Sequence, residues 1–326
     1  MPSSMTHGYF SLDVYDKLSK KYKTNVNLDK FRAFSQGPDF YYFYHFLLNK
    51  DKDKYYGIGR KMHRSYVFDY FYTLINYIND NNLFDNSDVK SYLYGHICHY
   101  ILDSTCHPFI FYKTGVFKKK NKKTYKYNSL HADMEYYIDA YLIYQREKIL
   151  PHKYKVYDKV FNVDSFNNEL SKLIDRVMKE VYDVENASKI YLKGIKRTKL
   201  FFRLFCNDEY GIKKIIYNTV DKITPSMITK ISPLSYYGKS KQKINYLNLD
   251  KKEWNHPCDI DEKFNYSFIE LYLKAIDKSV KIIKDVSNML ENKKIDKEKL
   301  STLLQDNSYL TGKNWKDKNK IQYFEF

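Results

Sequence analysis

Histidine is scarce in this chain, yet three of its nine histidines fall within residues 96–109, the stretch HICHYILDSTCHPF. Residues four apart lie on the same face of a helix, one turn above each other. His99 and Asp103 have this spacing, and so do His131 and Glu135. An imidazole and a carboxylate that face the same way suit a metal such as zinc, and burying both without a cation costs several kcal/mol. The two pairs therefore predict a metal site.

A further histidine follows the first pair. His107 directly precedes Pro108, and the residue before a proline avoids the helical conformation. We therefore expect the helix that carries His99 and Asp103 to end near His107, so that this imidazole can turn toward the second pair. Three more candidates come from elsewhere in the chain. Together they are more ligands than one tetrahedral zinc can bind, and their number suits two or three metal ions with a bridging carboxylate. The candidate ligands are His7, Asp39, His63, His99, Asp103, His107, His131 and Glu135.

Helices are the elements expected to position these residues. Glycine (10) and proline (7) are few, and long stretches have apolar residues three and four apart. We predict one all-α domain over residues 1–326, with a metal-site half over 1–150 and a helical remainder over 151–326 that has a loop insertion near 230–264. The first expected helix starts after Thr6 or Ser11. The others cover residues 40–48, 60–80, 87–106, 129–150, 165–184, 191–206, 212–223 and 268–290.

The chain is strongly basic, with 56 Lys and Arg against 39 Asp and Glu and a formal net charge of +17. Such a charge attracts phospholipid headgroups, nucleic acid or phosphorylated substrates, although the codon bias of an AT-rich genome accounts for it equally well. The basic segment 117–128 lies between two ligand motifs. We expect it at the rim of a cleft, either in contact with an anionic membrane or polynucleotide or simply as a solvated loop.

Two features bear on the compartment in which the protein works. No run of about 18 apolar residues is present, and the first residues lack the basic and apolar regions of a signal peptide. A cytoplasmic location is therefore expected. The four cysteines form no CxxC pair and are expected to be free thiols.

The other histidines are interpreted as structural. His96 lies near the helix face of Asp103, and we expect it to be packed or to contact a ligand rather than to bind metal itself. His45 lies in an aromatic run and is expected in the core. His152 is expected on the surface, and His256 is expected to have a structural or helix-capping role.

Taken in order, these motifs resemble the zinc-dependent phospholipase C family, in particular its shorter, cytoplasmic-type bacterial branch. The resemblance rests on SQGPDFYYFY, MH, YGHICHYILDSTCHPF and HADMEYYID within residues 1–140, and more loosely on KEWNHPCDIDEKFNYSFIELYLKA and YLTG. It implies an all-α fold, three zinc ions at the base of a cleft, and cleavage of phosphodiesters. Related single-strand-specific zinc nucleases share the cluster.

The resemblance also implies a role for each ligand. It places one zinc on Asp39, His63, His99 and Asp103, a second on Asp103 and His7, and a third on His107, His131 and Glu135. Asp39 would be the general base, and Asp139 and Asp133 are expected to orient ligand histidines.

The chain departs from the secreted enzymes of this family in two places. Those enzymes bind zinc through the amine and carbonyl of an N-terminal tryptophan, whereas removal of Met1 here would leave Pro2, five residues from His7. The spacing from Asp103 to His107 is also shorter. A site with two zinc ions therefore stays open beside one with three.

We expect a metal-dependent phosphoric diester hydrolase that acts on phospholipid headgroups or a related phosphodiester. The alternatives are a single-strand-specific zinc nuclease, and a catalytically weak metal-binding protein on the same scaffold.

Overall fold

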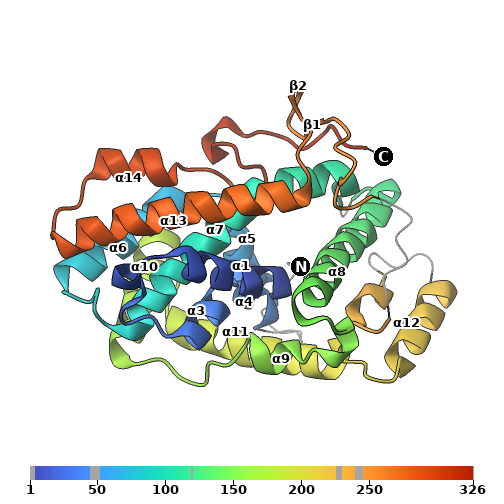
Figure 1. Ribbon diagram of the computed structural model, residues 1–326, viewed down its shortest axis with the longest axis horizontal. Helices are drawn as coiled ribbons and strands as arrows, with labels where there is room; N and C mark the ends of the chain where they lie inside the picture. The colour runs from blue at the N-terminus through green and yellow to red at the C-terminus, as the bar shows by residue number, and fades with distance from the viewer. Residues whose placement is uncertain (1–3, 45–51, 119, 225–229, 239–244, 326) are drawn as a thin grey trace.

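The computed structural model describes residues 4–44, 52–118, 120–224, 230–238 and 245–325, and helices dominate it (Figure 1). The all-α prediction is confirmed, because the sheet within these residues is a single antiparallel hairpin of β1 (Trp254–His256) and β2 (Asp259–Phe264). The α-helices are α1 (Ser4–Lys17), α2 (Lys20–Lys23), α3 (Leu28–Phe34), α4 (Phe40–Phe43), α5 (Lys52–Met62), α6 (Val67–Asp80), α7 (Ser87–Thr114), α8 (Tyr125–Glu147), α9 (Val156–Lys159), α10 (Asn168–Tyr182), α11 (Ala187–Phe201), α12 (Ile212–Ile223), α13 (Phe268–Glu291) and α14 (Lys297–Leu304).

The helix α7 is the central element. It has 28 residues, and nearly all of them are buried. The helices α1, α3, α8 and α13 pack against it, and α13 runs alongside it in Figure 1. A helix that is covered on every side shields its polar side chains from water, so those side chains need partners inside the protein.

Three of the expected elements are interrupted, only partly described, or different in kind. The predicted helix 60–80 is interrupted between α5 and α6, because the chain turns at Tyr66, which has a left-handed backbone (φ 58°). Of the helix expected over 40–48, only α4 falls in the described part of the chain, and His45 lies outside the described residues. The segment 230–264, expected as a loop insertion, contains the hairpin β1–β2.

Buried apolar side chains from both halves of the chain, from Met5 to Tyr309, form one cluster. The single-domain organisation stays a prediction beside this observation. All four cysteines are free, and three of them are buried. Among the described helices, none combines the length and the apolar character that a membrane span requires.

Candidate metal centre

The helix α7 does not end near His107, so that prediction is wrong. It continues through Pro108 to Thr114. A proline inside a helix leaves the carbonyl four residues earlier without its usual N–H donor. That carbonyl belongs to Ser104, and the backbone of Gly312 packs closely against it: a Cβ on Gly312 would lie 2.4 Å from the oxygen. The chain therefore accommodates Pro108 by tertiary packing, and the helix carries His107 one turn beyond the aspartate.

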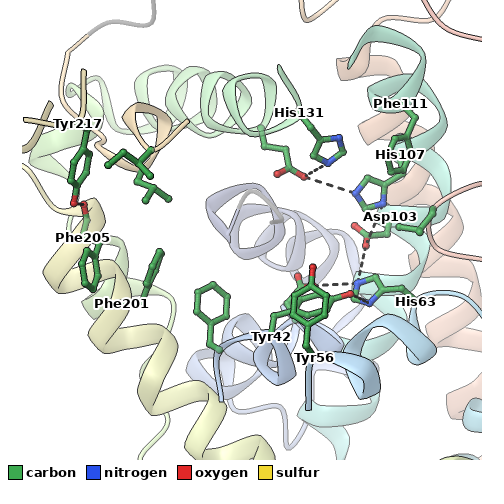
Figure 2. Close-up of a pocket in the computed structure, with 16 residues that line it drawn as sticks. Tyr42, Tyr56, His63, Asp103, His107, Phe111, His131, Phe201, Phe205 and Tyr217 are labelled. Carbon is green, nitrogen blue, oxygen red and sulfur yellow. Dashed lines mark hydrogen bonds and ion pairs between the residues drawn. The ribbon is translucent and has the colours of Figure 1, made fainter. Parts of the chain in front are cut away.

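Asp103 lies at the middle of the candidate centre and is buried. Its Oδ1 is 3.2 Å from His7 Nε2, and its Oδ2 is 3.3 Å from His99 Nε2, 3.5 Å from His107 Nδ1 and 3.7 Å from His63 Nε2. Burial raises the pKa of the carboxyl, but the neighbouring His107 and His99 outweigh it and hold that pKa well below its usual range. One carboxylate thus faces four imidazoles, as a bridging ligand would. Figure 2 shows two of them, His63 and His107.

Backbone carbonyls fix the orientation of three of these imidazoles. The pairs are His63 Nδ1 with Gly59 O at 2.7 Å, His99 Nδ1 with Ser35 O at 3.1 Å, and His107 Nδ1 with Tyr309 O at 3.1 Å. A carbonyl oxygen only accepts hydrogen bonds, so each neutral ring carries its proton on Nδ1 and presents a lone pair on Nε2. Fixing the tautomer in this way is what partners of metal-binding histidines do.

The resulting set of donors fits a cation. His63 Nε2 and His99 Nε2 are 3.4 Å apart, and His63 Nε2 is 3.2 Å from Asp39 Oδ1. Lone pairs and carboxylate oxygens at these distances repel each other unless a positive charge lies between them. Three sets have ligand atoms that all lie within 4.8 Å of one another: His7, His99 and Asp103; Asp39, His63 and His99; and His107, His131 and Glu135.

A tight turn places Asp39. It belongs to a 3₁₀ turn, Gly37–Asp39, that precedes α4. Gly37 has φ 49°, and a Cβ there would lie 2.4 Å from Cγ of His99, so only glycine lets the turn approach this ring. Among the described residues neither carboxylate oxygen of Asp39 has a hydrogen-bond partner, and its ion pair with His63 is the contact that holds it.

The third set joins α7 to α8. His131 and Glu135 lie one turn apart on α8, with Nε2 3.1 Å from Oε1. The same oxygen is 4.0 Å from His107 Nε2, and Thr114 Oγ1 is 3.3 Å from His131 Nδ1. The spacing of four residues places both side chains on one face of α8, as expected, and the packing of α8 on α7 brings them to His107.

His7 reaches the centre because Asp139 anchors the first turn of its helix. The Asp139 carboxylate accepts hydrogen bonds from Met5 N (3.2 Å), Thr6 N (2.8 Å), Thr6 Oγ1 (2.8 Å) and the Tyr236 hydroxyl (2.7 Å). Burial raises the pKa of Asp139 to about 6, although these hydrogen bonds oppose the rise. The ring of His7 stacks on that of His99 at a centroid distance of 4.5 Å. Pro2, the expected source of an N-terminal ligand, lies outside the described residues.

Among the described residues, no hydrogen bond or ion pair joins Asp139 or Asp133 to a ligand histidine, contrary to expectation. Asp139 instead caps α1 from α8. Asp133 is half-buried, and burial raises its pKa against the opposing charges of Lys214 and Lys230. Backbone carbonyls take the orienting role. No sequence signal marks them, because every residue carries a carbonyl and only the tertiary fold selects one.

His96 lies outside the three sets and is fully packed. Its Nδ1 is 2.9 Å from the Tyr70 hydroxyl and its Nε2 is 3.2 Å from the Tyr191 hydroxyl. Burial lowers its pKa well below the ordinary value, so the ring is neutral. The Tyr191 hydroxyl in turn donates to the carbonyl of Gly37 (2.9 Å). His96 therefore supports the turn that carries Asp39, in keeping with a packed role.

The remaining two histidines that the structure describes also lie apart from the centre. His256 is buried, its Nε2 is 2.9 Å from the carbonyl of Thr311, and its Nδ1 accepts from the Cys258 N–H (3.1 Å), so it is structural as expected. His152 was expected on the surface. It is half-buried and its ring lies 4.9 Å from that of Tyr237.

A cavity of about 580 Å³ opens onto the centre. One wall contains six of the eight candidate ligands, all but His7 and His99, and the opposite wall is apolar and aromatic (Figure 2). The apolar lining residues are Tyr42, Phe43, Tyr56, Phe111, Phe201, Phe205, Tyr217, Ile231, Leu234 and Leu310. No described residue of 117–128 lines the cavity, so the basic segment is not part of its wall. No local sequence pattern marks this apolar wall, because its residues come from distant segments of the chain.

Comparison with known proteins agrees with this geometry. The model of a family described as zinc dependent phospholipase C matches residues 6–186, more than half of the chain and all eight candidate ligands. Searches of the curated proteins and of the solved structures gave no match. The match and the helical fold together show that the chain belongs to the zinc-dependent phospholipase C family, a family of hydrolases.

Proposed function

We propose that the protein is a phosphodiesterase of the phospholipase C type. It would hydrolyse the bond between the glycerol oxygen and the phosphorus of a phospholipid, and release diacylglycerol and a phosphorylated headgroup. One observation carries the proposal: a single cavity has members of all three candidate metal-binding sets on one wall and an apolar wall opposite. A phospholipid has the same two halves, a charged phosphodiester and an apolar body.

The candidate ligands would hold two or three zinc ions. Zinc in these sets would supply a water of lowered pKa and neutralise charge on the phosphoryl oxygens. Asp39, whose carboxylate oxygens face the centre, would orient or deprotonate the attacking water. Phe201, Phe205 and Tyr217 would contact the apolar part of the substrate and exclude bulk water.

A single-strand-specific nuclease is the second candidate, and the aromatic wall is the observation that favours it. Bases stack on such side chains. Proteins that bind single strands also follow the phosphate backbone with basic residues, yet neither lysine nor arginine lines the cavity among the described residues. The composition of the wall therefore favours lipid over nucleic acid.

A substrate panel with zinc analysis tests this function. Zinc-loaded protein is incubated with phosphatidylcholine, single-stranded DNA and a water-soluble phosphodiester, and wild type is compared with Asp103→Asn. The exposed Asp80 provides a control variant, Asp80→Asn. We expect release of phosphorylated headgroup by wild type and by Asp80→Asn, and at least about a hundredfold less by Asp103→Asn.

Three outcomes would contradict parts of this proposal. Cleavage of DNA without cleavage of phospholipid would identify a nuclease. Bound zinc with no turnover of any phosphodiester would identify a metal-binding protein. Full activity of Asp103→Asn would remove the bridging role of that carboxylate.

A further inference from the structure

The helix α12 is amphipathic, but its apolar face points outward. Ile212, Ile215, Ile216 and Ile223 are 60%, 69%, 52% and 74% exposed. They lie on one side of the helix, because Ile215, Ile216 and Ile223 follow Ile212 by three, four and eleven residues, close to one and three full turns. Single exposed apolar side chains are common, whereas several on one helix face indicate a surface that another molecule covers.

Hydrogen bonds on the polar face fix this orientation. The bonds are Lys214 Nζ to Ser232 O (2.8 Å), Tyr217 hydroxyl to Phe205 O (3.1 Å), Ile231 N and Ser232 N to the Asp221 carboxylate (2.8 and 3.0 Å), and Lys213 Nζ to Asn207 O. All of them attach the polar side of α12 to the protein. Rotating the helix to bury its isoleucines would break them, so the outward face is built into the fold.

The side of α12 opposite its outward face borders the cavity. Tyr217 of α12 lines the cavity, and so does Phe205, whose carbonyl accepts its hydrogen bond. Two further apolar or aromatic side chains, Leu204 (48% exposed) and Tyr210 (78%), are exposed in the segment that precedes α12 in the chain. In Figure 1 α12 lies at one end of the molecule. The helix is thus a wall of the cavity on one side and a free apolar face on the other.

We propose that the outward face of α12, made of Ile212, Ile215, Ile216 and Ile223, inserts into the surface of an anionic lipid bilayer. The choice of a lipid partner rests on the proposed function, because a phospholipid substrate must pass from a bilayer into the cavity that α12 borders. The net charge of +17 attracts the protein to anionic headgroups, and the exposed Lys222 beside the isoleucines can contact their phosphates. Interfacial helices bind membranes in this way, with the apolar face among the acyl chains.

Vesicle binding tests the proposal. Full-length zinc-loaded protein is sedimented with vesicles of phosphatidylcholine and phosphatidylserine in equal parts, and wild type is compared with Ile215→Asn/Ile216→Asn. This pair keeps the charge of the protein. The control is Ile260→Asn/Leu273→Asn, which changes two side chains that are each 53% exposed elsewhere. We expect at least about tenfold weaker binding by the α12 variant, and binding like wild type by the control.

A second measurement reports insertion directly. The Ile216→Trp variant should show quenching by vesicles that contain brominated acyl chains, beyond the quenching of wild type. Absence of this extra quenching, absence of vesicle binding by wild type, or unchanged binding by the Asn pair would each overturn the proposal. A dimer in sedimentation velocity that only the α12 variant dissociates would also overturn it, because a second copy would then cover the face.

The design separates this proposal from the proposed function. Turnover of a water-soluble phosphodiester needs the centre but no membrane, and we expect it to be equal in wild type and both double variants. If soluble substrate is cleaved while vesicle binding is independent of α12, membrane insertion of the outward face is refuted and the phosphodiesterase activity is supported. If vesicle binding depends on α12 while no phosphodiester is cleaved, membrane insertion of the outward face is supported and the phosphodiesterase activity is refuted.

Discussion

Replacing Asp139 by alanine tests how the protein holds His7 at the centre. The carboxylate accepts two backbone N–H groups of the first turn of α1 and the hydroxyls of Thr6 and Tyr236. It does the work of a helix cap, although it belongs to α8. We expect Asp139→Ala to destabilise the fold and to loosen the turn that precedes His7, so that less zinc is bound.

The expected loss of stability follows from the hydrogen bonds that Asp139→Ala removes. Removal of a helix cap costs about 1 kcal/mol. A buried hydroxyl left without an acceptor costs about 1–3 kcal/mol, and both Thr6 and Tyr236 are affected. Part of this loss is offset, because the substitution also removes a buried charge. Burial of that charge is unfavourable, since it raises the pKa of Asp139 to about 6. The expected net decrease in the free energy of unfolding is about 2 kcal/mol.

Urea denaturation followed by circular dichroism, together with zinc analysis of the folded protein, measures both effects. Asp139→Asn keeps one acceptor oxygen, so its loss should be smaller than that of alanine. Asp133→Asn on the same helix is the control, because Asp133 is half-buried and forms no hydrogen bond to α1 among the described residues. The reasoning is refuted if Asp139→Ala retains wild-type stability and zinc content, or if the control loses as much.

Two further predictions concern the centre itself. Gly37→Ala places a Cβ 2.4 Å from Cγ of His99 at a backbone with φ 49°. Activity should therefore fall at least about tenfold, and the free energy of unfolding should fall by about 1 kcal/mol or more. The control Gly57→Ala has open space around the new Cβ and should be neutral or slightly stabilising. Kinetic assays with thermal melting measure both variants, and equal behaviour would contradict the argument. Removal of zinc by a chelator should lower the melting temperature by on the order of 10 °C, because carboxylates and imidazole lone pairs then face each other, and added zinc should restore it. A melting temperature that does not respond to chelator or zinc would exclude a structural contribution of the metal.

Sequence spacing predicted those parts of the centre that depend on local geometry. His131 and Glu135 lie on one helix face because four residues make about one turn, and that relation holds wherever the helix packs. The same argument placed His99 beside Asp103. The prediction that the helix ends near His107 was wrong. It used only the local tendency of the residue before a proline to avoid the helical conformation, whereas the packing of Gly312 against the carbonyl of Ser104 is a contact between distant segments.

The helical class, the family and the candidate ligands can be predicted from the chain alone, because helical periodicity and residue type are properties of the sequence. Three features depend instead on tertiary packing: which carbonyls orient the imidazoles, how Asp139 anchors the helix of His7, and which residues form the apolar wall. Tertiary packing also decides the orientation of α12. The hydrophobic periodicity of 212–223 predicts a helix with two faces, but which face meets solvent depends on hydrogen bonds to segments that follow and precede it. Contacts between distant segments are set by the whole fold, so no local pattern specifies them.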